Sequence, residues 1–101
     1  MTREDFYSLI EKELVPSCIQ ILKTKGEAYT LGDDRLISFK KNSNLLGISP
    51  EKQWFTYFIK HFDSVTSYIN ENYSDSEPIE TRIQDMINYL FLLYGLIKDR
   101  K

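Results

Sequence analysis

The feature that most constrains this chain is its closing segment, residues 86–97. Nearly all of it is apolar, and its aliphatic and phenylalanine side chains are Met86, Ile87, Leu90, Phe91, Leu92, Leu93, Leu96 and Ile97. A surface helix carries apolar residues over about a third of its circumference, whereas these would cover most of it. A helix formed here therefore needs cover on more than one side. Either a symmetry mate packs against it, or the other helices of its own chain wrap around it.

The N-terminal part of the chain predicts one long, interrupted helix. Thr2 can cap its start, because a hydroxyl oxygen accepts an otherwise unpaired backbone amide of the first turn. Pro16 has no amide hydrogen to donate, so a kink or a restart of the helix is expected there. Gly26, after two lysines, predicts the end of the helix. A loop is expected over 27–33.

The remainder predicts three more helices and no strand, because period-two alternation is absent. A short helix, capped by Asp33 or Asp34, should end near Gly47. A long helix should start at Pro50 and continue to about residue 72, and a polar turn over 70–76 should lead to a last helix over 78–98. The expected buried side of the long helix is Trp54, Phe58, Phe62, Val65 and Ile69. The predicted fold is a single all-α domain, 1–101, built as a three- to four-helix bundle with a kinked first helix and a strongly apolar last one.

Composition restricts the classes of function. The net charge of −2 provides no global basic field, so general nucleic-acid binding is not expected. The apolar run 86–97 would span about 18 Å as a helix, well short of a ~30 Å hydrocarbon layer, so no membrane association is expected. A single cysteine, Cys18, and an N-terminus unlike a signal peptide indicate a cytoplasmic protein. The apolar content of 42% is high for a small monomer and favours a homo-oligomer.

Polar residues interrupt the apolar last helix on one strip. Arg82, Asp85 and Tyr89 follow one another at i, i+3 and i+7, and Asn88 lies near them. A carboxylate on such a strip needs donors nearby, since an unpaired buried charge is strongly disfavoured. The candidate donors are on the preceding long helix: Lys60, His61 and Ser64.

Two interpretations of this strip stay open. In the functional one, a pocket between helices holds an anion on Lys60 and Arg82 while Asp85 and Asn88 recognise a polar ligand. In the structural one, the network fixes helix register, and His61 is a packing residue. The candidate ligand-binding residues are Lys60, His61, Ser64, Arg82, Asp85, Asn88 and Tyr89. No catalytic residue is assigned, because no phosphate loop, Cys/His cluster or HExxH motif is present.

Three strings resemble the nucleotide-modification-associated, MazG-like proteins of phages and prophages. These strings are 33–40 (DDRLISFK), 60–64 (KHFDS) and the series Glu77, Thr81, Asp85, Asn88, Tyr89 on the last helix, and the resemblance covers about two thirds of the chain. It implies an all-α oligomer that handles nucleotides, with a divalent metal such as Mg²⁺ in the enzymes. The EExxE motif of those enzymes is missing from the helix that carries Lys60, and Ile83 stands where their ExxD motif has its aspartate. Binding without turnover is therefore expected.

Three hypotheses of function follow. The first is a non-catalytic, phage-type protein that binds a nucleotide or signalling nucleotide between helices or at a subunit interface. The second is a metal-dependent nucleotide pyrophosphohydrolase that uses Asp33, Asp34, Glu77 and Asp85 with Mg²⁺. The third is an inhibitor from a mobile element that binds a host enzyme.

Overall fold

The computed structural model describes residues 1–29, 32–71 and 77–100, and this part of the chain is all-α, without a β-strand. The elements in order are α1 (Arg3–Leu9), the π-helical turn η1 (Ile10–Leu14), α2 (Val15–Tyr29), α3 (Ile37–Leu46), α4 (Pro50–Glu71) and α5 (Ile79–Asp99). Most of the predicted turn over 70–76, including Ser76, lies outside the described residues. Within them, no helix is both long and apolar enough to cross a membrane.

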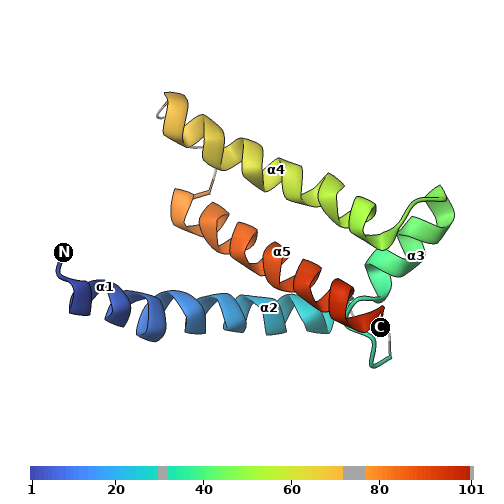
Figure 1. The fold of residues 1–101 in the computed structure, drawn as a ribbon, viewed down its shortest axis with the longest axis horizontal. Helices are drawn as coiled ribbons and strands as arrows, with labels where there is room; N and C mark the ends of the chain where they lie inside the picture. The colour runs from blue at the N-terminus through green and yellow to red at the C-terminus, as the bar shows by residue number, and fades with distance from the viewer. Residues whose placement is uncertain (30–31, 72–76, 101) are drawn as a thin grey trace.

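The N-terminal elements α1, η1 and α2 form one continuous rod (Figure 1). The Thr2 hydroxyl caps it as predicted, accepting the Asp5 amide at 3.0 Å. The predicted kink or restart at Pro16 is replaced by the π-helical turn just before it, whose wider ring fits a position that cannot donate a hydrogen bond. The predicted stop at Gly26 is wrong, because α2 continues to Tyr29.

The starts and stops of the later helices follow their local chemistry. Gly47 ends α3 with φ of 68°, a left-handed conformation that glycine adopts without steric cost. The Ser49 hydroxyl accepts the Lys52 amide at 3.2 Å at the start of α4. Asp34 accepts the Leu36 amide at 3.0 Å just before α3. The signals at Gly47 and Ser49 confirm the predicted end of α3 and start of α4. The predicted cap of α3 by Asp33 or Asp34 is wrong, because Leu36 holds the N-cap position without a side-chain cap hydrogen bond and α3 begins at Ile37.

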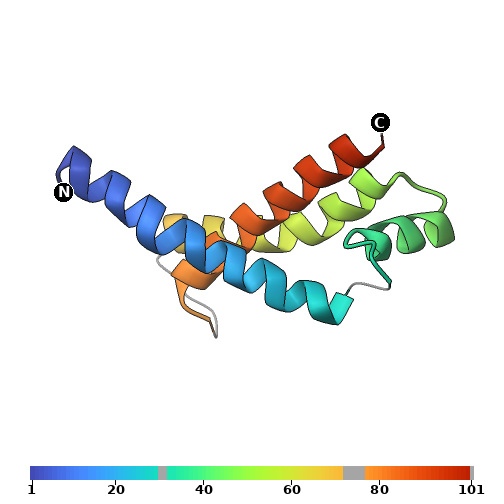
Figure 2. The ribbon, with the colours of Figure 1, turned by 90° about the horizontal axis from the view of Figure 1, so that it is seen from below.

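Helices α4 and α5 lie antiparallel and side by side, with α3 across the end of α4 and α2 against α5 (Figures 1 and 2). The buried core is small and lies where α3, α4 and α5 meet: Phe39, Trp54 and Leu96. Neither α1 nor η1 contains a buried residue, and the rod extends past the start of α5 (Figure 2). The well-packed part of the molecule is therefore the end opposite the N-terminus.

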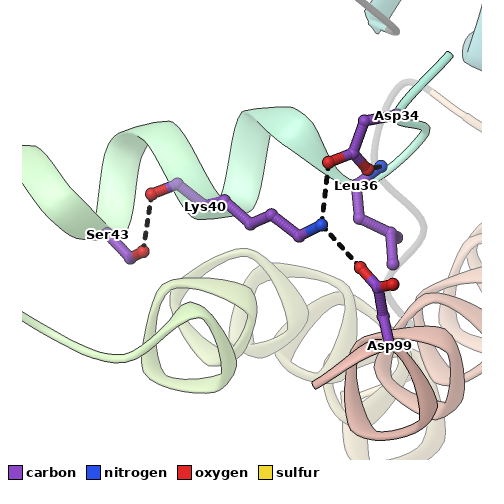
Figure 3. A network of polar contacts seen from close by, with 5 residues as sticks. All are labelled: Asp34, Leu36, Lys40, Ser43 and Asp99. Carbon is purple, nitrogen blue, oxygen red and sulfur yellow. Dashed lines mark hydrogen bonds and ion pairs between the residues drawn. The ribbon is translucent and has the colours of Figure 1, made fainter. Parts of the chain in front are cut away.

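Lys40 forms two ion pairs, one with Asp34 just before α3 and one with Asp99 at the C-terminal end of α5. Lys40 Nζ lies 2.7 Å from Asp34 and 2.5 Å from Asp99, as Figure 3 shows. The hydrogen bonds from Lys40 and from the Leu36 amide lower the pKa of Asp34, and the two carboxylates raise the pKa of Lys40. All three charged groups are partly exposed, so the network fixes geometry more than it adds stability.

One side of the α4–α5 pair is left uncovered. Leu90 and Tyr94 of α5 are 48% and 65% exposed, although the sequence predicted cover on more than one side of this helix. The predicted buried side of α4 is wrong at Phe62 and Ile69, which are also exposed. Other helices of the same chain therefore do not wrap α5 completely.

Candidate functional site

A cavity of about 300 Å³ lies between α2, α3, α4 and α5. Its volume is at the lower end of the 300–1,000 Å³ that is common for small-molecule sites. Its polar and charged lining comes from three separate parts of the chain and consists of Lys25, Arg35, Ser38, Asn42, Asp85 and Asn88. Such a mixture of a few convergent polar groups with apolar walls is typical of a ligand site.

Asp85 is the buried charge of this cavity. The residue is 6% exposed, and its carboxylate lies 3.4 Å from Lys25 Nζ and 3.6 Å from His61 Nδ1. The lysine comes from α2 and the histidine from α4, so the carboxylate of α5 connects three helices. A buried carboxylate left without a cationic partner would be strongly destabilising, which gives Lys25 a structural reason to point inward.

His61 lies between Asp85 and Tyr89, and its side chain is 16% exposed. Burial lowers the pKa of His61, and the positive charges of Arg82 and Lys25 lower it further, whereas Asp85 opposes this shift. Within the described residues Nδ1 has no hydrogen-bond partner, since 3.6 Å to Asp85 is too long. A neutral imidazole is therefore favoured, and Lys25 is the cation that balances Asp85.

Asn88, one turn after Asp85, is the least satisfied group of the cavity. It is 5% exposed, and neither its amide nitrogen nor its amide oxygen has a hydrogen-bond partner among the described residues. Leaving a buried donor or acceptor unpaired costs about 1–3 kcal/mol. A native structure rarely leaves both ends of an amide unpaired, so the position requires an explanation.

Part of the cavity lining is an aromatic wall. Tyr57 and Tyr89 both line the cavity, with ring centroids 6.4 Å apart and ring planes 29° from parallel. The Trp54 indole donates to the backbone carbonyl of Tyr89 at 2.5 Å and fixes the level of α5 against α4. The wall offers flat π surface to a planar ligand.

Arg35 brings a second positive charge to the cavity, and Gly26 makes room for it. A Cβ atom on Gly26 would lie 2.8 Å from Arg35 Nε, so a larger residue at position 26 would displace the guanidinium. Arg35 Nη2 also donates to the Leu22 carbonyl at 3.5 Å. Gly26 is therefore a site of close approach, not a helix stop.

The structure brings only part of the predicted set of site residues together. Asp85, Asn88 and Tyr89 line the cavity, and His61 adjoins it through Asp85.

Lys60, Ser64 and Arg82 do not line the cavity. Lys60 is exposed, with Nζ 6.0 Å from the centre of the Tyr57 ring. The Ser64 hydroxyl donates to the Lys60 carbonyl of its own helix at 3.1 Å. Arg82 lies 3.8 Å from Glu77. The basic residues that line the cavity are therefore Lys25 and Arg35, and not the expected Lys60 and Arg82.

The sequence contained a signal for Lys25 that was missed. Cys18 and Leu22 share one face of α2 with Lys25 at i, i+4 and i+7, and Cys18 is completely buried. A lysine on an otherwise inward face needs a buried acid, and Asp85 supplies it. Burial, followed by the charge of Asp85, raises the pKa of the Cys18 thiol, so this cysteine is protonated at neutral pH.

The acidic residues that the hydrolase hypothesis requires do not share one site, and those in ion pairs contact different basic residues. Asp34 is paired with Lys40, Asp85 with Lys25, and Glu77 lies near Arg82, while Asp33 is exposed. In the described ranges, no group of three His, Cys, Asp or Glu residues is arranged to hold a metal ion.

Comparison of the chain with protein-family models, with curated proteins and with solved structures found no match. The resemblance to MazG-like proteins therefore stays a prediction. The functional argument rests on the cavity itself.

Proposed function

We propose that this protein binds a small anionic ligand of the nucleotide class in the cavity between α2, α3, α4 and α5, without turning it over. The single observation that carries the proposal is Asn88, whose amide is buried, lines the cavity and lacks partners at both ends within the described chain. A ligand edge that presents one donor and one acceptor would satisfy both atoms at once.

Nucleobases have such an edge. An asparagine amide pairs bidentately with the adjacent donor and acceptor atoms of adenine, and other bases offer similar pairs. Tyr57 and Tyr89 provide the flat surface on which a base can stack. The cavity of about 300 Å³ favours one base with its sugar over a dinucleotide.

The charges at the cavity favour an anion. Lys25 and Arg35 contribute two positive charges against the single negative charge of Asp85, while the lowered pKa of His61 keeps its ring neutral. The surplus positive charge suits a phosphate monoester, which arginine can hold through two parallel hydrogen bonds.

Binding without turnover is favoured by the pairing of the acids. A Mg²⁺-dependent hydrolase needs several carboxylate oxygens directed at one metal ion. Two of the acids that the hydrolase hypothesis requires, Asp34 and Asp85, are instead each paired with a lysine. The phage-type origin and the host-inhibitor hypothesis stay predictions that the cavity does not address.

A thermal-shift panel of nucleoside mono-, di- and triphosphates tests the proposal, because a ligand that binds only the folded state raises Tm. We expect at least one mononucleotide to stabilise the wild-type protein and Asn88→Leu to lose this effect. Lys60→Ala is the control and should keep the stabilisation by nucleotide, because Lys60 lies near the Tyr57 ring but does not line the cavity. Lack of stabilisation across the panel, or equal losses in both variants, would contradict the proposal.

Turnover separates the proposal from the hydrolase hypothesis. The wild-type protein, incubated with Mg²⁺ and the stabilising nucleotides, should release neither pyrophosphate nor phosphate. Release that Asp85→Asn abolishes would overturn the non-catalytic part of the proposal.

A further inference from the structure

We propose that the uncovered side of α5 binds a second copy of this chain, running antiparallel, in a two-fold symmetric dimer. This side, which we name the outer face, consists of Ile83, Ile87, Leu90 and Tyr94. Ile83, Leu90 and Tyr94 are 41–65% exposed, and Ile87 is half-buried. The proposal is independent of ligand binding.

The spacing of the outer face suits helix pairing. Its residues follow one another at intervals of four, three and four, which is the spacing of apolar residues in a helix–helix seam. At 100° per residue, this seam lies on the side of α5 away from Asp85 and Leu92, which line the cavity. The seam and the cavity are thus separate surfaces of one helix.

Charges at the two ends of the seam identify a second copy as the occupant. Glu80 lies one turn before Ile83, and Lys98 lies one turn after Tyr94. Both are exposed, and neither forms an ion pair with any residue that the structure describes. In an antiparallel pair of α5 helices, Ile83 meets Tyr94 of the other copy, Ile87 meets Leu90, and each Glu80 meets a Lys98. One surface is then complementary to itself, as a two-fold interface requires.

A stripe on α4 points to the same two-fold axis. Phe55, Ile59 and Phe62 lie at i, i+4 and i+7 and are 39–52% exposed. The midpoint of this stripe falls at 58–59, and the midpoint of the α5 seam falls at 88–89.

These two midpoints lie level in the structure. Tyr89 accepts a hydrogen bond from Trp54 and packs 4.9 Å from the His61 ring, one turn on each side of Phe58. One axis perpendicular to both helices can therefore match the α5 seam with its copy and the α4 stripe with its copy, giving four helices around a shared apolar layer.

The mass of the particle in solution is the first test. Light scattering and sedimentation should give twice the 12.0 kDa chain mass at micromolar concentration. Leu90→Lys should give the single-chain mass with an unchanged helical circular-dichroism spectrum, because Leu90 is half exposed in the single chain. The control Leu45→Lys changes a 78% exposed leucine on α3, outside both stripes, and should stay dimeric.

Charge reversal tests the antiparallel direction. Glu80→Lys and Lys98→Glu should each raise the dimer Kd by roughly tenfold at low salt, since each variant places like charges at both ends of the seam. An equimolar mixture of the two variants should restore wild-type affinity, because both ends then pair opposite charges. In a parallel pair, neither variant alone would dimerise more weakly than wild type.

Other results would overturn the proposal. A wild-type chain that stays at single-chain mass at high micromolar concentration excludes the second copy. If that monomer also co-sedimented with anionic lipid vesicles, the outer face would be assigned to a membrane surface instead. A dimer that Leu90→Lys leaves intact would place the interface elsewhere.

Discussion

The two sides of α5 contrast in an unusual way. The inner side buries Asp85 and Asn88, whereas the outer side exposes Leu90 and Tyr94. An ordinary surface helix has the opposite pattern, with apolar residues inside and polar residues outside. Both departures cost free energy in the isolated, ligand-free chain. The two contacts that we propose, a polar ligand inside and a second copy outside, would each offset one of these costs.

The largest expected effect is a difference in stability between two substitutions at adjacent positions of α4, one buried and one exposed. Trp54→Ala removes a buried indole from the core and its hydrogen bond to Tyr89, and should lower the free energy of unfolding by roughly 3–5 kcal/mol. Phe55→Ala, one residue further along, should cost less than about 1 kcal/mol in the monomer, because Phe55 is half exposed. Urea denaturation at low protein concentration measures both, and equal losses would show that α4 has no inner and outer side.

Asn88→Leu replaces a buried polar side chain on the inner side of α5 with an apolar one, and so tests the contrast between the two sides. Removing a buried, unpaired amide should raise the free energy of unfolding of the ligand-free protein by about 1–3 kcal/mol, while nucleotide affinity falls more than about tenfold. Stability is measured by denaturation and affinity by calorimetry. The control is Asn44→Leu on the exposed side of α3, which should change neither quantity strongly. A destabilised Asn88→Leu would mean that the amide has a structural partner.

Gly26→Ala should have a smaller effect on stability and a selective one on binding. Alanine favours the helix by up to about 1 kcal/mol, but its Cβ would displace Arg35. The free energy of unfolding should therefore change by less than about 1 kcal/mol, whereas nucleotide affinity should fall roughly three- to tenfold. Arg35→Lys, which leaves Gly26 intact, should reproduce the loss of affinity, and unchanged affinity in both variants would remove Arg35 from the site.

The pH dependence of stability should show the smallest effect. The pKa of His61 lies below its ordinary value of 6.5 in the folded protein, so the unfolded chain takes up the proton first as the pH falls. Stability from this residue is present above pH 6.5 and is lost progressively below it. His61→Gln should flatten this part of the profile of Tm against pH. A steeper profile in the variant would mean that Asp85 holds His61 in its charged form.

Local signals in the sequence predicted most of the helix boundaries. Thr2 and Ser49 cap their helices with side-chain hydroxyls, and Gly47 ends α3 through its left-handed backbone conformation. These effects are local, so they do not depend on distant residues. The effect of Pro16 could not be predicted in the same way. A continuous helix can accommodate a residue without an amide hydrogen by forming a π-helical turn before it. Phe62 is exposed despite its apolar spacing, because no other helix of the described chain covers that side of α4.

The predicted site residues that line the cavity all belong to α5, while His61 of α4 adjoins it through Asp85. Asp85 and Asn88 stand out as polar residues within an apolar helix, a pattern that one segment reveals by itself. Lys25 is 60 residues away from Asp85 in the chain, and Arg35 precedes a different helix. Their positions depend on how α2 and α3 pack, which periodicity does not determine.

The most direct test of the account follows the side-chain amide of Asn88 by NMR. On titration with a mononucleotide that raises Tm, the Asn88 NH₂ signals should move together with the backbone signals of Lys25 and Arg35, while those of Leu90 and Tyr94 stay in place. A stabilising nucleotide that leaves the Asn88 signals unmoved at saturation would contradict the claim that this amide is the group that receives the ligand.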